Sequence, residues 1–183
     1  MQAPLFIAHV RASTTGSTMR ANCHPFAYQN WNFAHNGQIG GFYKMQRSLE
    51  SLLSDQLYQA RQGTTAAELL SLLLLQFSLL KSVEIACGKA IGILKRMSTK
   101  MSISEPLRIA AVGADGSDLF ALRYASDAYS QTLYRSRKLD NGGITIASES
   151  LDNIRHNYAP IMPSCLVLVS AGGEIQDLGL KIS

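Results

Sequence analysis

Asn36 and Gly37 are adjacent residues whose types suit the stabilisation of a developing oxyanion. The alternating residues 28–34 predict a strand, which we expect to end at His35-Asn36-Gly37. A glycine exposes a backbone N–H that no side chain shields, and an asparagine amide can donate to the same point. Two such donors suit a tetrahedral oxyanion. The alternative is a turn that only needs a left-handed residue.

Arg11 is a second candidate for chemistry, at the end of an apolar run over residues 4–10 that predicts a buried strand. It is followed by a loop rich in Ser and Thr, and it is the only charged residue between Met1 and Met19. Its guanidinium suits a bidentate contact with a carboxylate. The alternative is a surface arginine at a strand end.

Cys23 and His24 are neighbours, as in a nucleophile and its base. Adjacent residues of an extended segment point to opposite sides, so the pair is poorly placed for this chemistry. The three cysteines are widely spaced without a C-x-x-C motif, which argues against a zinc site. We interpret the histidines His9, His24 and His35 as structural.

The composition describes a globular chain, with 46% hydrophobic and 16% charged residues. The net charge is +4, but the basic residues are scattered, which argues against nucleic-acid binding. The start has no signal-peptide pattern, and the apolar run 69–80 is too short to span a membrane. We therefore expect one domain, residues 1–183, in the cytoplasm with reduced thiols.

The remaining elements are expected in two groups. Residues 43–60, 66–80 and 83–97 predict helices, and the second is apolar nearly all round, as in a helix sandwiched between layers. Thr64 or Thr65 is its expected N-cap, with Glu68 in the first turn. After Pro106 short strands follow, beginning with a hairpin around Asp115-Gly116. Segregated helices and mainly antiparallel strands indicate an α+β fold of two sheets with helices outside.

Several stretches, in their order and spacing, resemble the class II glutamine amidotransferases. These are "AHVRASTTG", "NCHPF", "FAHNGQIGGF" and "GTTAAELL", followed by the later strands "LFALRYAS" and "GITIASES". The likeness is to the stand-alone bacterial branch that includes the γ-glutamyl hydrolase of ergothioneine synthesis. It implies an N-terminal-nucleophile fold, a four-layer α-β-β-α sandwich.

The resemblance also implies roles for individual residues. Arg11 grips the α-carboxylate of the substrate, Thr14 helps to bind it, and Asn36 with the N–H of Gly37 forms the oxyanion hole. The family reaction hydrolyses the side-chain amide of glutamine or a γ-glutamyl compound through a cysteine thioester. The base is the nucleophile's own α-amine, so neither a histidine nor a cofactor is required.

The sequence departs from the family pattern in two places. The family nucleophile is a cysteine at the mature N-terminus, whereas Met1 is followed here by Gln2. We therefore expect a chain that lacks the first strands of the sandwich. Most relatives also carry an aspartate that binds the substrate's ammonium group, and the matching position is Ala66, followed by Ala67.

Three functions remain open on this basis. The first is an amidotransferase-like hydrolase domain in truncated form, which has no glutaminase activity as it stands. The second is a non-enzymatic descendant that binds a small amino-acid ligand or a protein partner, and the third is a hydrolase that uses Cys23. A small-molecule ligand is expected, without nucleic acid or membrane, and an unpaired sheet edge favours self-association.

Overall fold

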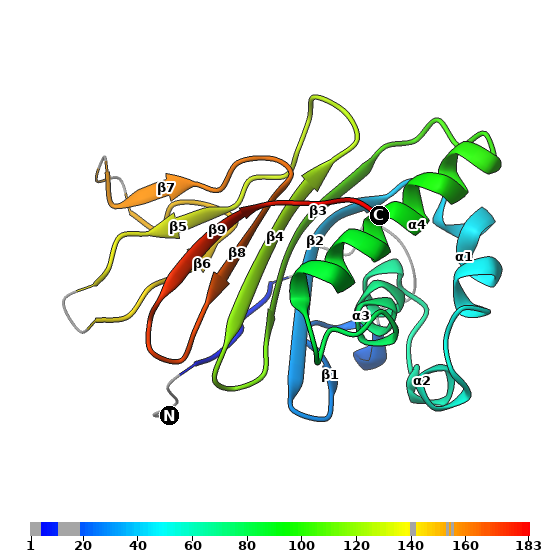
Figure 1. Ribbon diagram of the computed structural model, residues 1–183, viewed down its shortest axis with the longest axis horizontal. Helices are drawn as coiled ribbons and strands as arrows, with labels where there is room; N and C mark the ends of the chain where they lie inside the picture. Colours follow the sequence, from blue (N-terminus) through cyan, green and yellow to red (C-terminus); the bar gives the residue numbers. More distant parts are fainter. Residues whose placement is uncertain (1–4, 11–18, 140–141, 153, 155) are drawn as a thin grey trace.

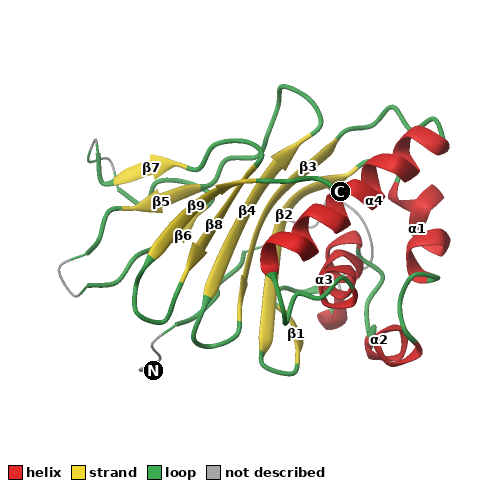
Figure 2. Cartoon of the chain, viewed as in Figure 1, coloured by secondary structure: helices red, strands yellow, loops and turns green. Residues whose placement is uncertain are grey.

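The computed structural model describes residues 5–10, 19–139, 142–152, 154 and 156–183, and within them nine strands form two sheets beside four α-helices. In chain order the elements are η1 (Arg20–Asn22), β1 (Phe26–Tyr28), β2 (Trp31–Ile39), α1 (Phe42–Glu50), α2 (Asp55–Ala60), α3 (Ala66–Gln76), α4 (Val83–Lys100), β3 (Leu107–Ala114), β4 (Leu119–Ala125), β5 (Tyr134–Ser136), β6 (Ile146–Ala147), β7 (Tyr158–Pro160), β8 (Cys165–Val169) and β9 (Ile175–Gly179). Figure 2 shows the helices grouped beside β1–β3.

The larger sheet has six antiparallel strands in the order β1-β2-β3-β4-β8-β9. β3 and β4 form the hairpin that Asp115-Gly116 predicts. The Asp115 carboxylate accepts the N–H groups of Ser117 and Asp118 at 2.9 and 2.8 Å, and Gly116 has a φ of +95°. The sequence prediction is therefore confirmed at this turn.

The two faces of this sheet are covered differently. Ile109, Phe120 and Leu166 belong to the main core, into which the helices pack, whereas Ala110, Ala121 and Val167 belong to a second, smaller core. The second core also contains Leu133 and Ile161, which flank the three-stranded sheet β6-β5-β7. Figure 1 shows β5 and β7 at the end of the molecule opposite α1. Helices thus cover one face and the small sheet covers part of the other.

Helix α3 lies inside the helical layer, as its apolar sequence predicts. It contacts β2 as well as α1, α2 and α4, and its residues from Ala67 to Leu74 are all buried. Its N-cap is Thr65, whose side-chain oxygen accepts the N–H of Glu68 at 3.2 Å. α4 runs three residues beyond its predicted end.

Residues 43–60 form two helices, so the prediction of one continuous helix is wrong. The first ends at Glu50, and the next begins after Ser54, whose side-chain oxygen caps it by accepting the N–H of Leu57 at 3.4 Å. The N–H of Ser54 is itself bound by the Gln76 side chain at 2.9 Å. This contact with the end of α3 fixes a break that helical periodicity alone does not reveal.

Other differences concern the strands. Residues 5–10 form no strand, although their exposure alternates as in an extended segment, so that prediction is wrong for the described part of the run. β7 has no counterpart among the predicted strands, whereas the predicted strands of "LFALRYAS" and "GITIASES" are confirmed as β4 and as the two-residue β6. None of the helices in the described residues is long and apolar enough to cross a membrane.

Candidate active site

Asn36 and Gly37 lie inside β2, where both are exposed. They pair with Ala110 and Ile109 of β3, and pairing continues through Ile39. The expectation that the strand ends at Asn36-Gly37 is therefore wrong. Gly37 has an unusual backbone conformation, with a φ of +144°, and it still pairs within the ladder.

Gly37 occupies a position that only glycine fills without strain. Its φ of +144° lies in the region that L-residues avoid. A Cβ on this residue would stand 2.0 Å from the carbonyl oxygen of Arg108 and 2.9 Å from its carbonyl carbon. Both the conformation and the close approach of the β3 backbone therefore require glycine here.

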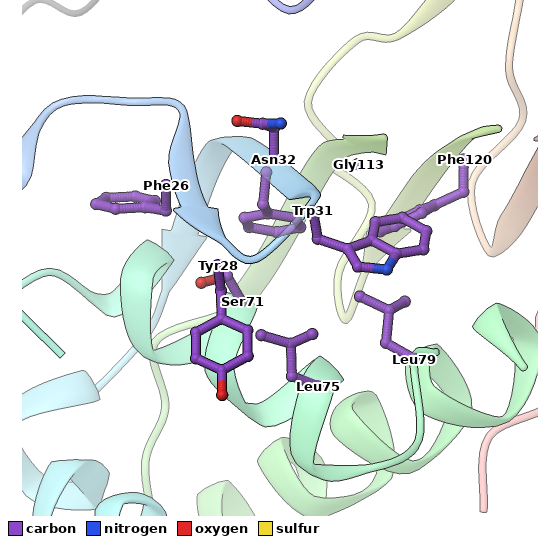
Figure 3. A pocket seen from close by; sticks show the side chains of 10 residues that line it. Phe26, Tyr28, Trp31, Asn32, Ser71, Leu75, Leu79, Gly113 and Phe120 are labelled. Carbon is purple, nitrogen blue, oxygen red and sulfur yellow. The ribbon is translucent and has the colours of Figure 1, made fainter. Parts of the chain in front are cut away.

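Asn36 points to the face of the sheet opposite the helices. Figure 3 shows Asn32 of the same strand directed away from α3, whereas Trp31 and Tyr28 are directed toward it. Side chains alternate along a strand, so Asn36 shares the face of Asn32. Within the described residues no hydrogen bond of the Asn36 side chain is found. An exposed amide thus stands beside the glycine, as an oxyanion-binding pair requires.

Arg11 and Thr14 lie outside the described residues, so their roles in binding the substrate stay predictions. In the six-stranded sheet the neighbours of β2 are β1 and β3.

His35 precedes the pair and is buried, with 7% of its surface exposed. Burial lowers the pKa of His35 from 6.5 to about 4; the nearby backbone of Arg108 opposes this shift, and His9 adds to it. The Nε2 atom is buried and makes no hydrogen bond of good geometry, so the contact with the Arg108 backbone only partly offsets the effect of burial on the pKa. The imidazole is therefore neutral near pH 7.

Cys23 and His24 lie at the segment that leads into β1. The Cys23 thiol is exposed and donates to the carbonyl oxygen of Met19 at 3.6 Å. The His24 ring packs on His9, with centroids 4.2 Å apart, and on Phe26, with centroids 4.6 Å apart. Packing of this kind suits the structural role expected for His24.

The loop before α3 is held by an ionic network that the sequence did not predict. Arg61 binds the Glu50 carboxylate and lies 3.7 Å from the Glu68 carboxylate. Burial works to raise the pKa of Glu50, but hydrogen bonds from Gln46 and Arg61 outweigh it and lower the pKa. The network connects α1, the loop and α3.

The same loop is tied down through its backbone. The Glu68 carboxylate accepts the N–H of Gln62 at 2.7 Å and that of Gly63 at 2.8 Å. Asn22 accepts the N–H of Thr64 at 2.9 Å, across 42 residues of sequence. The loop therefore presents the first residue of α3, Ala66, from a fixed position.

Ala66 has no carboxylate to offer an ammonium group. The acidic residue in the first turn of α3 is Glu68, which is buried and already hydrogen-bonded to the loop backbone. It therefore does not stand in for the aspartate that the resemblance predicts at this position.

Two further observations bear on other kinds of site. Within the described residues no group of three or more His, Cys, Asp or Glu side chains could hold a metal ion. A cleft between the β1–β2 hairpin and the end of α3 is apolar, and Figure 3 shows its lining. It is lined by Phe26, Tyr28, Trp31, Asn32, Phe33, Ser71, Leu75, Leu79, Gly113 and Phe120. Asn36 and Gly37 are not part of it.

Residues 1–159 match the family of class-II glutamine amidotransferases. A segment of 64 residues is 44% identical to the probable glutamine amidotransferase DUG3 of Saccharomyces cerevisiae, and it covers 35% of this chain but only 18% of the yeast protein.

Solved structures give the same result. A glutamine aminotransferase class-II domain protein from Silicibacter pomeroyi is 30% identical with a TM-score of 0.82, over 90% of this chain and 74% of that one. The glutamine phosphoribosylpyrophosphate amidotransferase from B. subtilis is 17% identical with a TM-score of 0.60, over 96% of this chain and 34% of that one. At this identity the likeness is one of fold alone. These likenesses confirm the expected α+β sandwich of the N-terminal-nucleophile type.

Proposed function

The chain belongs to the class II glutamine amidotransferases, and from this premise we propose that it binds the side-chain amide of glutamine or a γ-glutamyl compound. Asn36 and Gly37 are the proposed oxyanion donors. The observation that carries the proposal is the left-handed Gly37, with φ +144°, beside an exposed asparagine within a paired strand. Arg11 and Thr14 are the proposed contacts to the rest of the substrate.

The proposed chemistry follows from these donors. A thiolate attacks the amide carbon, and the carbonyl oxygen becomes an oxyanion that the Asn36 amide and the Gly37 N–H stabilise. The amide nitrogen takes up the proton that the nucleophile's α-amine removed from the thiol, and ammonia leaves as the C–N bond breaks. Water then cleaves the resulting thioester to give the free carboxylate and the thiol. Removing one donor of this kind costs about 2.7–4 kcal/mol of transition-state stabilisation.

The nucleophile in the family reaction is a cysteine at the mature N-terminus. The part of the reaction that we assign to residues 1–183 is the binding of the ligand and the stabilisation of the oxyanion. We expect Ala66 to weaken binding by about 1.5–3 kcal/mol, because a charge-assisted contact to the substrate ammonium is lost.

A non-enzymatic role is the second candidate, and Ala66 is the observation that favours it. Glu68 is held by the N–H groups of Gln62 and Gly63, so the ammonium site has no evident replacement. A carboxylate ligand without an α-amine would fit such a site better than glutamine.

The test measures binding and turnover on one preparation of residues 1–183. We expect glutamine or a γ-glutamyl amide to bind in calorimetry, Arg11→Ala to weaken binding at least about tenfold, and glutamate release to stay at the level of the blank. Equal binding by glutamine and by glutarate monoamide, which lacks the amine, supports the non-enzymatic candidate. Glutamate release that Cys23→Ala abolishes would instead make Cys23 the nucleophile.

A further inference from the structure

The His35 side chain is buried beside the proposed oxyanion donors, and its ring interacts with the backbone of Arg108, although its Nε2 atom makes no hydrogen bond of good geometry. Buried polar atoms are well paired in the large majority of cases, so this position of the ring calls for a physical reason. The reaction proposed above gives this histidine no task, because the base in that reaction is an α-amine.

The surroundings of Gly37 supply a reason. A Cβ built on this glycine would lie 2.0 Å from the Arg108 carbonyl oxygen and 3.1 Å from His35 Nε2. The imidazole and the β3 backbone therefore occupy the space beside the Gly37 α-carbon from two sides. A residue held in this way keeps its φ of +144° even where the strand around it is exposed.

The protonation state agrees with a role in packing. Burial lowers the pKa of His35 to about 4, with His9 contributing in the same direction. A neutral ring places no charge against the glycine at pH 7, and a base this weak would not take a proton from a thiol.

We propose that His35 is a positioning residue for the oxyanion donors: its neutral imidazole supports Gly37 against the Arg108 carbonyl and so preserves the backbone conformation that presents the Gly37 N–H. The inference rests on the proposed function in one respect, which is the expected effect of His35 on glutamine binding. The coupling between His35 and Gly37 is a separate property of the ligand-free protein.

The experiment compares three variants of the 183-residue chain. His35→Ala removes the supporting ring, and His35→Gln keeps a side chain whose amide reaches the position of Nε2. Phe33→Ala is the control, because Phe33 is also buried and lies two residues earlier on the same face of β2. The φ of Gly37 is measured at pH 7 from the NMR couplings between its N–H and its two α-protons, and glutamine is titrated into each variant.

We expect His35→Ala to change the Gly37 couplings and to raise the glutamine Kd about tenfold, the loss of one good hydrogen bond. His35→Gln should restore the couplings and most of the affinity. Phe33→Ala should lower the thermal midpoint while the Gly37 couplings stay as in the parent chain.

Unchanged Gly37 couplings in His35→Ala would overturn the inference, and so would equal changes in Phe33→Ala. If His35→Ala does not fold, His35→Gln decides: wild-type couplings support the inference and altered ones contradict it. If glutamine does not bind the parent chain, the proposed function fails, while the couplings still decide the role of His35.

Discussion

The loop before α3 and the Asn36-Gly37 stretch of β2 differ in how their polar groups are bound. In the loop, Glu68 accepts two backbone N–H groups, Asn22 accepts a third, and Arg61 joins Glu68 to Glu50, although the Nε and Nη2 atoms of Arg61 are buried without a hydrogen bond. In the strand, the Asn36 side chain is exposed and the described residues offer its amide no partner.

This difference distinguishes the loop, which supports α3, from the strand, which carries the proposed site. A polar group that is bonded inside the protein contributes to one fixed structure, whereas an exposed donor binds water, which a ligand can replace. The loop therefore acts as a support that positions α3. The strand keeps its donors available, as an oxyanion-binding site requires.

The largest effect is expected at Gly37. Gly37→Ala should lower the free energy of unfolding by about 3–4 kcal/mol, because it combines backbone strain with a clash against the Arg108 carbonyl. Urea unfolding measures this. Gly116→Ala is the matched control, since Gly116 also has a positive φ, of +95°, but its Cβ would meet nothing within 4 Å. The control should lose only about 1–2 kcal/mol; equal losses would show that the Arg108 contact does not matter.

Glu68 comes next. Glu68→Gln keeps the volume but turns one of the two accepting oxygens into an NH2 donor that faces backbone N–H groups, so we expect a loss of about 2–3 kcal/mol in the free energy of unfolding. The Gly63 amide should exchange with solvent faster. Glu149→Gln, at an exposed position, should change stability by less than about 0.5 kcal/mol. A similarly small loss in Glu68→Gln would mean that the network is not a support.

The third prediction concerns pH. The pKa of His35 falls from 6.5 to about 4 on folding, so the unfolded chain takes up a proton between these values and the folded chain does not. The contribution of His35 is complete above pH 6.5 and is lost as the pH falls toward 4. Between pH 7 and pH 5 the loss is about 2 kcal/mol. Urea unfolding at both values should show this difference in the parent chain and a smaller one in His35→Gln; an identical difference in both would contradict the assignment.

The smallest effect on stability is expected at Asn36. Because its side chain is exposed and has no hydrogen bond among the described residues, Asn36→Ala should change the free energy of unfolding by less than about 0.5 kcal/mol. A thermal melt is sufficient to check this. A loss of 2 kcal/mol or more would place Asn36 with the scaffold rather than the site.

The sequence predicted the parts of the fold that depend on local signals. The turn at Asp115-Gly116 and the N-cap at Thr65 are formed by hydrogen bonds between residues two or three positions apart, so the local sequence was enough to predict them. The break at Ser54 was missed because Gln76, 22 residues away, helps to fix it.

The candidate site was predicted in part for the same reason. The residue types of Asn36 and Gly37 indicate their chemistry, but their pairing with β3 depends on Ala110 and Ile109, which lie 74 and 72 positions later. The roles of Asn22, Arg61 and His35 likewise arise from contacts between distant segments. No local sequence pattern indicates that a histidine is buried against a nearby glycine.

The central claim is that the Asn36-Gly37 stretch receives the amide carbonyl of the ligand. Its most direct test is a titration of the ¹⁵N-labelled 183-residue chain with glutamine, or with a γ-glutamyl amide, followed by NMR. We expect saturable shifts of the Gly37 backbone N–H and the Asn36 side-chain amide, and at least about tenfold weaker binding in Asn36→Ala. Saturable shifts confined to other segments, or unchanged affinity in Asn36→Ala, would contradict it.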